Sequence, residues 1–330
     1  MKSKLLFLVA VVAVSLSSCK TDDVVNPPVN QAKVDSLVSG VGYATDVYYS
    51  LKNGVVKTAP RAEWDLAFAT ISKSVSILIN SGSKDSLFVW KSGAIADFAK
   101  AAALDNNKNL ATSFDSLSWY NHSAFEQNLS PTNPYDQGWG IYNGTTHDVA
   151  GDSVYILKLA DGTYKKIAII SRNATTFAFK FKIANLAANA ATDTVTITPA
   201  SYPTKNFIYY AVATKTVIDR EPDKTTWDFV FTKYDSKLAG NPLVSGILTN
   251  EGVSSVKLVG ADSTKVYTAT TFTKKVSNIG FDWKHFNGSS YDIVNPYYFV
   301  HGVDGNYYQL KFTAFKYATG VTLFTVKKLN

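Results

Sequence analysis

Hydrophobic and polar residues alternate along much of the chain, which is the pattern of strands with one buried face. Residues 154–170 alternate in this way on either side of an Asp-Gly pair at 161–162, and residues 297–315 do so around an Asp-Gly pair at 304–305. Asp-Gly accepts the positive φ angles of a tight turn, so each stretch predicts a β-hairpin. Further strands are predicted at 177–183, 194–197 and 322–327.

The same landmarks occur twice in the same order. Trp139, Asn143 and Asp148 recur 144 positions later as Trp283, Asn287 and Asp292. The pairs Tyr48-Tyr49 and Trp64-Asp65 likewise recur as Tyr209-Tyr210 and Trp227-Asp228. A repeated series of landmarks indicates a duplication. We therefore expect an all-β fold with two tandem domains, over residues 40–190 and 197–330.

The first copy is the longer one. Gly82 and Trp139 are 57 residues apart, whereas their counterparts Gly252 and Trp283 are 31 apart. The extra segment contains an Ala-rich helix, predicted over 94–104, and the motif Trp-Tyr-Asn-His at 119–122. A minor helical insertion of this kind could form a lid or a binding loop, or it could be a decorative loop without function.

The N-terminus reads as a targeting signal. Lys2 and Lys4 precede an apolar run of twelve residues, 5–16, which is too short to span the ~30 Å hydrocarbon core of a bilayer as a helix. The run ends at Cys19, the one cysteine of the chain, and resembles a bacterial lipoprotein signal with its lipobox. That resemblance implies a signal peptide over 1–18 and a lipid on the Cys19 sulfur, followed by a polar tether over 19–39. An ordinary secretory signal is the alternative.

The acidic pair Asp22-Asp23, soon after Cys19, resembles the surface-export signal of Bacteroidetes lipoproteins. It implies a protein on the outer face of the outer membrane. A lipoprotein that faces the periplasm is the alternative.

Charge and motifs argue against two classes of function. The formal charge is +7, but the basic residues are scattered, so no nucleic-acid footprint is present. The sequence has no GxSxG, HExxH or phosphate-loop motif, and we expect a protein that is not an enzyme. A hydrolase with carboxylates clustered only in the fold remains a third possibility. The Trp-Asp pairs are expected to be structural, with the indole in the core and the carboxylate capping a turn.

Two histidines suggest a haem site. His122 and His147 both belong to the first copy, and Tyr291 replaces His147 in the second. A lone histidine is most often a surface or core residue without a ligand, but two imidazoles on opposite faces of a haem would complete an octahedral iron site. The aromatic candidates for stacking on a porphyrin are Trp119, Tyr120, Trp139 and Tyr142. Arg172 is a candidate for binding propionates.

The chain resembles the HmuY haem-binding lipoproteins of Bacteroidetes. The stretches that carry the resemblance are WDLAF at 64–68, NSG at 80–82, GWGIYNGTTHD at 138–148 and YILKLADGTYKKI at 155–167. The second copy repeats the pattern more loosely, so the resemblance covers most of the chain after residue 40.

The resemblance implies an all-β surface lipoprotein that captures haem and hands it to a TonB-dependent outer-membrane receptor. It also implies iron held between two histidines, or by methionine in other members; Met1, the one methionine, lies in the signal. His147 matches the motif, and His122 is the candidate for the second axial ligand. The alternative is an adhesion module that recognises carbohydrate or protein through exposed aromatic residues.

Overall fold

The computed structural model describes residues 31–105, 110, 118–120, 123–237, 243–258, 272–295 and 297–329. The chain divides into residues 1–31 and a compact unit of residues 32–330, and the description below concerns the second unit. The predicted signal peptide, Cys19 and His122 lie outside the described residues. No helix of the described part is long and apolar enough to cross a membrane.

Strands are the main regular structure of the described residues, and they form antiparallel sheets, which confirms the all-β prediction. Their helices are short 3₁₀ turns: η1 (Val41–Tyr43), η2 (Arg61–Glu63), η3 (Ser81–Ser83), η4 (Ile95–Lys100), η5 (Phe125–Asn128) and η6 (Pro199–Ser201). The helix predicted over 94–104 is η4, which is shorter than expected because the chain turns extended at Ala101, with ψ at 111°.

Two sheets contain the strands of the middle of the chain. A seven-stranded sheet contains β6 (Ser86–Ala94), β7 (Gly140–Tyr142), β8 (Val149–Gly151), β9 (Ser153–Lys158), β10 (Tyr164–Arg172), β11 (Phe179–Asn185) and β12 (Thr192–Ile197). A four-stranded sheet has the order β14-β13-β4-β5, from β4 (Leu66–Ala69), β5 (Ile77–Ile79), β13 (Phe207–Ala211) and β14 (Thr216–Ile218). We call residues 61–218, which contain these strands, the first module.

Three further sheets combine the two ends of the chain. A five-stranded sheet has the order β1-β22-β21-β20-β17, from β1 (Lys33–Val38), β17 (Ser254–Lys257), β20 (Tyr297–His301), β21 (Tyr307–Lys316) and β22 (Val321–Lys328). A four-stranded sheet has the order β16-β15-β2-β3, from β2 (Thr45–Ser50), β3 (Gly54–Pro60), β15 (Phe229–Asp235) and β16 (Leu243–Thr249), and a hairpin pairs β18 (Lys284–Phe286) with β19 (Tyr291–Ile293). Residues 33–60 and 229–328 are called the second module.

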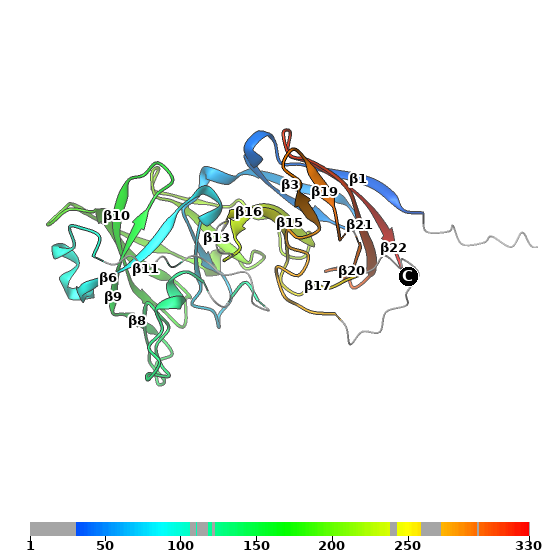
Figure 1. Cartoon of the computed structure of the whole chain (residues 1–330). Helices are drawn as coiled ribbons and strands as arrows, with labels where there is room; N and C mark the ends of the chain where they lie inside the picture. Colours follow the sequence, from blue (N-terminus) through cyan, green and yellow to red (C-terminus); the bar gives the residue numbers. More distant parts are fainter. Residues whose placement is uncertain are drawn as a thin grey trace, which may run out of the picture. The chain divides into compact units, whose positions relative to one another are not determined.

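The two modules do not coincide with the two sequence copies. The early hairpin β2–β3 belongs to the first copy but pairs with β15 of the second, and β13 of the second copy pairs with β4 of the first. β1 likewise runs antiparallel to β22, so that the first and last strands are neighbours (Figure 1). The copies therefore exchange their N-terminal strands.

The buried cores follow the modules. One core joins residues between Leu66 and Val212, and the other joins Leu37–Leu51 to residues between Phe229 and Val326. The predicted boundary near 190–197 falls at the hairpin of β11 and β12. Whether residues 40–190 and 197–330 fold as separate domains stays a prediction.

The Asp-Gly hairpins form as predicted. β9 pairs with β10 across residues 161–162, and β20 pairs with β21 across residues 304–305. Gly162 and Gly305 have φ angles of 86° and 76°, which is the left-handed conformation that selects glycine at these turns. Local turn chemistry therefore sets these registers.

The Trp-Asp landmarks hold the exchanged hairpins in place. Asp228 accepts a hydrogen bond from Leu51 N at 2.7 Å, and Asp65 accepts one from Val212 N at 2.6 Å. Each carboxylate therefore caps the turn of a hairpin that the other copy contributes, which confirms the capping role expected for these residues. Trp227 is buried in the core, as expected, whereas Trp64 is half-buried.

Candidate functional site

His147 lies in the exposed loop between β7 and β8 of the first module. Its Nδ1 shares a hydrogen bond of 2.5 Å with the hydroxyl of Tyr142, and the two ring centroids are 5.8 Å apart. When Nδ1 carries the ring proton and donates to this hydroxyl, Nε2 keeps a lone pair. A histidine ligand of a metal commonly has its other nitrogen bound in this way, which fixes the tautomer and the orientation of the ring.

The backbone of this loop is fixed by Asn143. Its side-chain oxygen accepts hydrogen bonds from Thr145 N and Thr146 N at 2.8 and 3.0 Å, and His147 N donates to Asn143 O at 2.8 Å. His147 then adopts a φ of 62°, which is uncommon for a residue other than glycine. Phe177 has nearly the same φ, 58°, at the matching position after Asn173, so this conformation belongs to the type of turn and fixes where His147 lies.

A second loop of the same kind lies against the first. Asn173 binds Thr175 N and Thr176 N as Asn143 does, and Asp148 accepts a hydrogen bond from Ala174 N at 2.7 Å. The two loops therefore form one rigid tip on the first module, with His147 on it.

Arg172 lies at the base of this tip and is only 3% exposed. Its guanidinium donates to the carbonyls of Ile71 and Ser72 and lies 5.4 Å from the ring centroid of Phe177. Burial lowers the pKa of Arg172 from its usual value. These contacts join the tip to the loop at Ile71 and Ser72. The binding of propionates by Arg172 stays a prediction.

The three remaining aromatic candidates lie away from His147 in the fold. Trp139 is fully buried in the first core, where its Nε1 donates to Val75 O at 3.1 Å. Trp119 and Tyr120 both pack on Phe207 of β13, at ring-centroid distances of 6.3 and 5.6 Å. The structure thus brings Tyr142 together with His147, and Trp119 together with Tyr120. His122 lies outside the described residues, so its distance from His147 is not tested.

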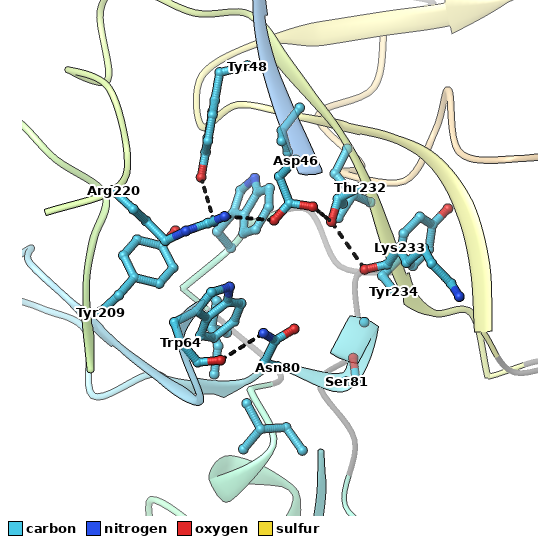
Figure 2. Close-up of a pocket in the computed structure, with 16 residues that line it drawn as sticks. Asp46, Tyr48, Trp64, Asn80, Ser81, Tyr209, Arg220, Thr232, Lys233 and Tyr234 are labelled. Atoms are coloured by element: carbon cyan, nitrogen blue, oxygen red, sulfur yellow. Dashed lines mark hydrogen bonds and ion pairs between the residues drawn. The ribbon is translucent and has the colours of Figure 1, made fainter. Parts of the chain in front are cut away.

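Trp119 also lines a small cavity whose walls come from both modules (Figure 2). At its edge, Arg220 binds Asp46 at 3.0 Å, Glu63 at 2.8 Å and the Tyr48 hydroxyl at 3.2 Å. The cavity measures about 50 Å³, which is room for a few water molecules and not for a porphyrin or a sugar.

The ionic network beside this cavity is structural. Arg61 binds the second oxygen of Asp46 at 3.0 Å, and Thr232 donates to the same oxygen at 2.7 Å. Burial alone would lower the pKa of Arg220, but Tyr48 and Asp46 beside it raise that pKa above its usual value. Removing one partner would leave a buried charge unpaired, so the network holds the two modules in register.

Sequence reasoning missed this network because its members are spread over 46–232 and match no motif. In the sequence, each of these charged residues simply lies in or beside a predicted strand. Exposed charged residues occur in the same positions, so the pattern does not reveal burial. Among the described residues, no three His, Cys, Asp or Glu side chains form a group that could hold a metal ion. A haem iron held by imidazoles needs no such group.

One of three comparisons with known proteins finds a match. Residues 42–181 match the model of the HmuY protein family, a range that includes His147, Tyr142 and Arg172. No curated protein and no solved structure matches the chain. The HmuY family is associated with haem binding, and its proteins are surface-associated. Residues 42–181 of the chain are therefore similar to the HmuY protein family.

Proposed function

We propose that this chain is a surface lipoprotein that binds haem or a related porphyrin through the tip of the first module, for the acquisition of iron or haem. The observation that carries the proposal is His147, whose imidazole is exposed and oriented by Tyr142 through Nδ1. The family match over this loop supports the same ligand.

The residues of the tip fit a haem. His147 would bind the iron through Nε2, and Tyr142 would hold the ring of His147 and lend an aromatic edge to the porphyrin. Haem supplies the iron, whereas the chain supplies a rigid imidazole on a loop fixed by Asn143. His122 is proposed as the second axial ligand, on the sequence analysis alone.

The same proposal includes the placement of the protein in the cell. The tether expected over 19–39 is shorter than predicted, because Lys33–Val38 form β1 and pair with β22. A lipid on Cys19 would hold the chain on the outer membrane through the residues before β1, and haem would pass to a TonB-dependent outer-membrane receptor. The protein would act as a carrier and not as an enzyme. The surface association of the family supports this placement.

A hemin titration of the full chain tests the proposal. We expect a saturable low-spin visible spectrum in both redox states, and we expect His147→Ala to abolish it or to weaken hemin binding by about tenfold or more. His301→Ala, which removes a histidine of the second module outside the cavities described here, is the control and should change nothing. A free-hemin spectrum with the wild-type chain, or equal spectra for wild type and His147→Ala, would overturn the proposal.

One observation favours a second function, the recognition of carbohydrate or protein. Phe286 and Tyr317 are 48% and 45% exposed, and their rings lie 6.3 Å apart on the second module. Exposed aromatic pairs stack on sugar rings and on protein side chains. A glycan-array screen that finds a ligand lost in Phe286→Ala, in a chain that does not bind hemin, would establish this function instead.

A further inference from the structure

The second module contains a cavity of about 330 Å³ that opens to solvent. This volume lies at the lower end of the range for small-molecule sites, ~300–1,000 Å³. Its walls include Tyr43, Ser245, Phe281, Lys284, Phe286 and Tyr291.

Lys284 is the unusual member of the wall. Its side chain is 7% exposed, and its ammonium donates one hydrogen bond, to Ser245 O at 2.5 Å. An ammonium has three N–H donors, and in the described part of the chain no second acceptor binds this one. Buried donors without acceptors are costly, so the arrangement favours an acceptor supplied from outside the chain.

Lys166 of the first module is a buried lysine whose ammonium finds all of its hydrogen-bond acceptors within the chain. Lys166 is fully buried, and its three donors bind the carbonyls of Ala99, Ala101 and Ala187 at 3.1, 3.1 and 2.7 Å. Lys284 has one such carbonyl. Aromatic rings and the open cavity surround the rest of the Lys284 ammonium, which leaves room for an acceptor from outside the chain.

The charges around the cavity point to an anion. Among the described residues that line it, Lys233, Lys284 and His285 are basic and none is acidic. The charge of Asp282 raises the pKa of Lys284, but Asp282 is exposed and forms an ion pair with Lys257 instead. Burial lowers the pKa of Lys284 to about 7, and an anion bound beside it would restore its charge.

The remaining walls are aromatic. The Lys284 ammonium lies 4.7, 4.9 and 5.6 Å from the ring centroids of Trp283, Phe315 and Tyr291. Phe286 packs on Tyr291 at 5.2 Å and is 48% exposed at the mouth. A flat apolar ring that enters between these side chains would bring an attached acidic group to the lysine.

The first module cannot form the same site. The position equivalent to Lys284 is Gly140, where an added Cβ would lie 2.4 Å from Ala150 O. His147 occupies the position of Tyr291. The exchange of strands adds a further difference, because Tyr43 of the first copy completes this wall of the second module and stacks on Phe315 at 5.8 Å.

We propose that this cavity binds a small aromatic carboxylate of one or two rings, with the carboxylate on the Lys284 ammonium and the ring between Phe286 and Tyr291. The inference does not depend on haem binding at His147, because it concerns different residues in the other module. Among the described residues the Lys284 ammonium has one hydrogen-bond acceptor and the cavity has no acidic lining, so an anionic group such as a carboxylate is favoured. The cavity volume limits the ligand to one or two rings.

The test is calorimetric titration of the full chain at pH 6.5 with 2-naphthoate and with its neutral analogue 2-naphthamide. We expect one saturable site for naphthoate and about tenfold weaker binding of the amide, which lacks the charge. Lys284→Met should weaken naphthoate binding by about tenfold or more. Lys316→Met, an exposed lysine of the same module, is the matched control and should bind as wild type does.

Lys284→Met could disturb the core, so its near-ultraviolet circular dichroism is compared with that of the wild type. If the variant does not fold, Phe286→Ala decides, since this exposed side chain contributes to the mouth and not to the buried core. The absence of naphthoate binding, equal affinity for the amide, or wild-type affinity in a folded Lys284→Met or in Phe286→Ala overturns the proposal. Naphthoate binding retained in His147→Ala separates this result from that of the hemin titration.

Discussion

Asp228 caps the turn that starts at Leu51, although the two residues are 177 positions apart in the chain. Leu51 N donates to one oxygen of the Asp228 carboxylate at 2.7 Å, and Val303 N donates to the other at 2.8 Å. One side chain therefore joins the N-terminal hairpin, the middle of the chain and the hairpin of β20 and β21.

We expect Asp228→Asn to destabilise the protein by about 1–3 kcal/mol, because a neutral amide keeps the shape but loses two charge-assisted hydrogen bonds. Urea unfolding followed by circular dichroism measures the change. Asp219→Asn, a change at an exposed carboxylate, is the control and should lie within about 0.5 kcal/mol of wild type. Wild-type stability in Asp228→Asn would show that the cap contributes nothing.

The strand exchange predicts which fragments of the chain fold. A fragment of residues 197–330 lacks Leu37, Val47 and Tyr49 of its core and leaves β22 and β15 with open edges. We expect it to lack a cooperative thermal transition. A permuted fragment consists of residues 219–330, then a short Gly-Ser linker, then residues 31–60. We expect this fragment to show a cooperative thermal transition.

The linker can be short because Lys33 is paired with Val326, so the start of β1 lies beside the end of β22. The contiguous fragment 61–218 is the companion experiment and should fold without any rearrangement. Cooperative unfolding of 197–330 alone would instead support the two domains expected from the repeat boundaries.

Asp85 should make stability depend on pH. Burial and the neighbouring charge of Asp65 raise the pKa of Asp85 to about 9, from 3.8 in an exposed aspartate. The folded state therefore holds a proton that the unfolded state releases above pH 4, so the stabilisation is complete below pH 4 and is lost as the pH rises towards 9.

We expect Asp85→Asn, which cannot ionise, to flatten this decline. Its free energy of unfolding relative to wild type should rise between pH 5 and pH 9 in a series of urea titrations. Parallel pH profiles for the two proteins would mean that Asp85 is charged in the folded state.

Tyr142 should influence haem binding without contacting iron. In Tyr142→Phe the ring of His147 loses the partner of Nδ1, so both the tautomer and the orientation become free. On the proposed function, we expect hemin affinity to fall by about 10-fold or more, as for other partners of metal-bound histidines. Tyr135→Phe, a change at a 53% exposed tyrosine, is the control. An unchanged hemin titration would remove the role assigned to Tyr142.

Local patterns predicted the local structure well. The Asp-Gly pairs at 161–162 and 304–305 fixed two hairpins, because a tight turn depends only on its own residues. The exchange of β2 and β13 could not be predicted from the sequence. The two copies resemble each other, so each of these strands has the right pattern to pair with the strand after Trp64-Asp65 or with the one after Trp227-Asp228. Register within a hairpin is local information, whereas the choice of partner is not.

The candidate site shows the same division. Tyr142 and His147 were predicted to belong to one site and do touch, since a short loop joins them. Lys284 was missed, because a lysine in the sequence Asp-Trp-Lys-His reads as exposed and its burial depends on Phe315 and Tyr291 from other strands. Composition and spacing do not reveal which side chains the fold assembles around a charge.

The pairing of β1 with β22 has a mechanical consequence. Any load on the N-terminal segment enters the compact unit at Lys33–Val38, where six residues pair with β22. The pull is therefore borne by the C-terminal copy, although the segment precedes the first copy in sequence. On the proposed function, an anchor at Cys19 would therefore be connected to the second module through β1, and not to the module that carries His147.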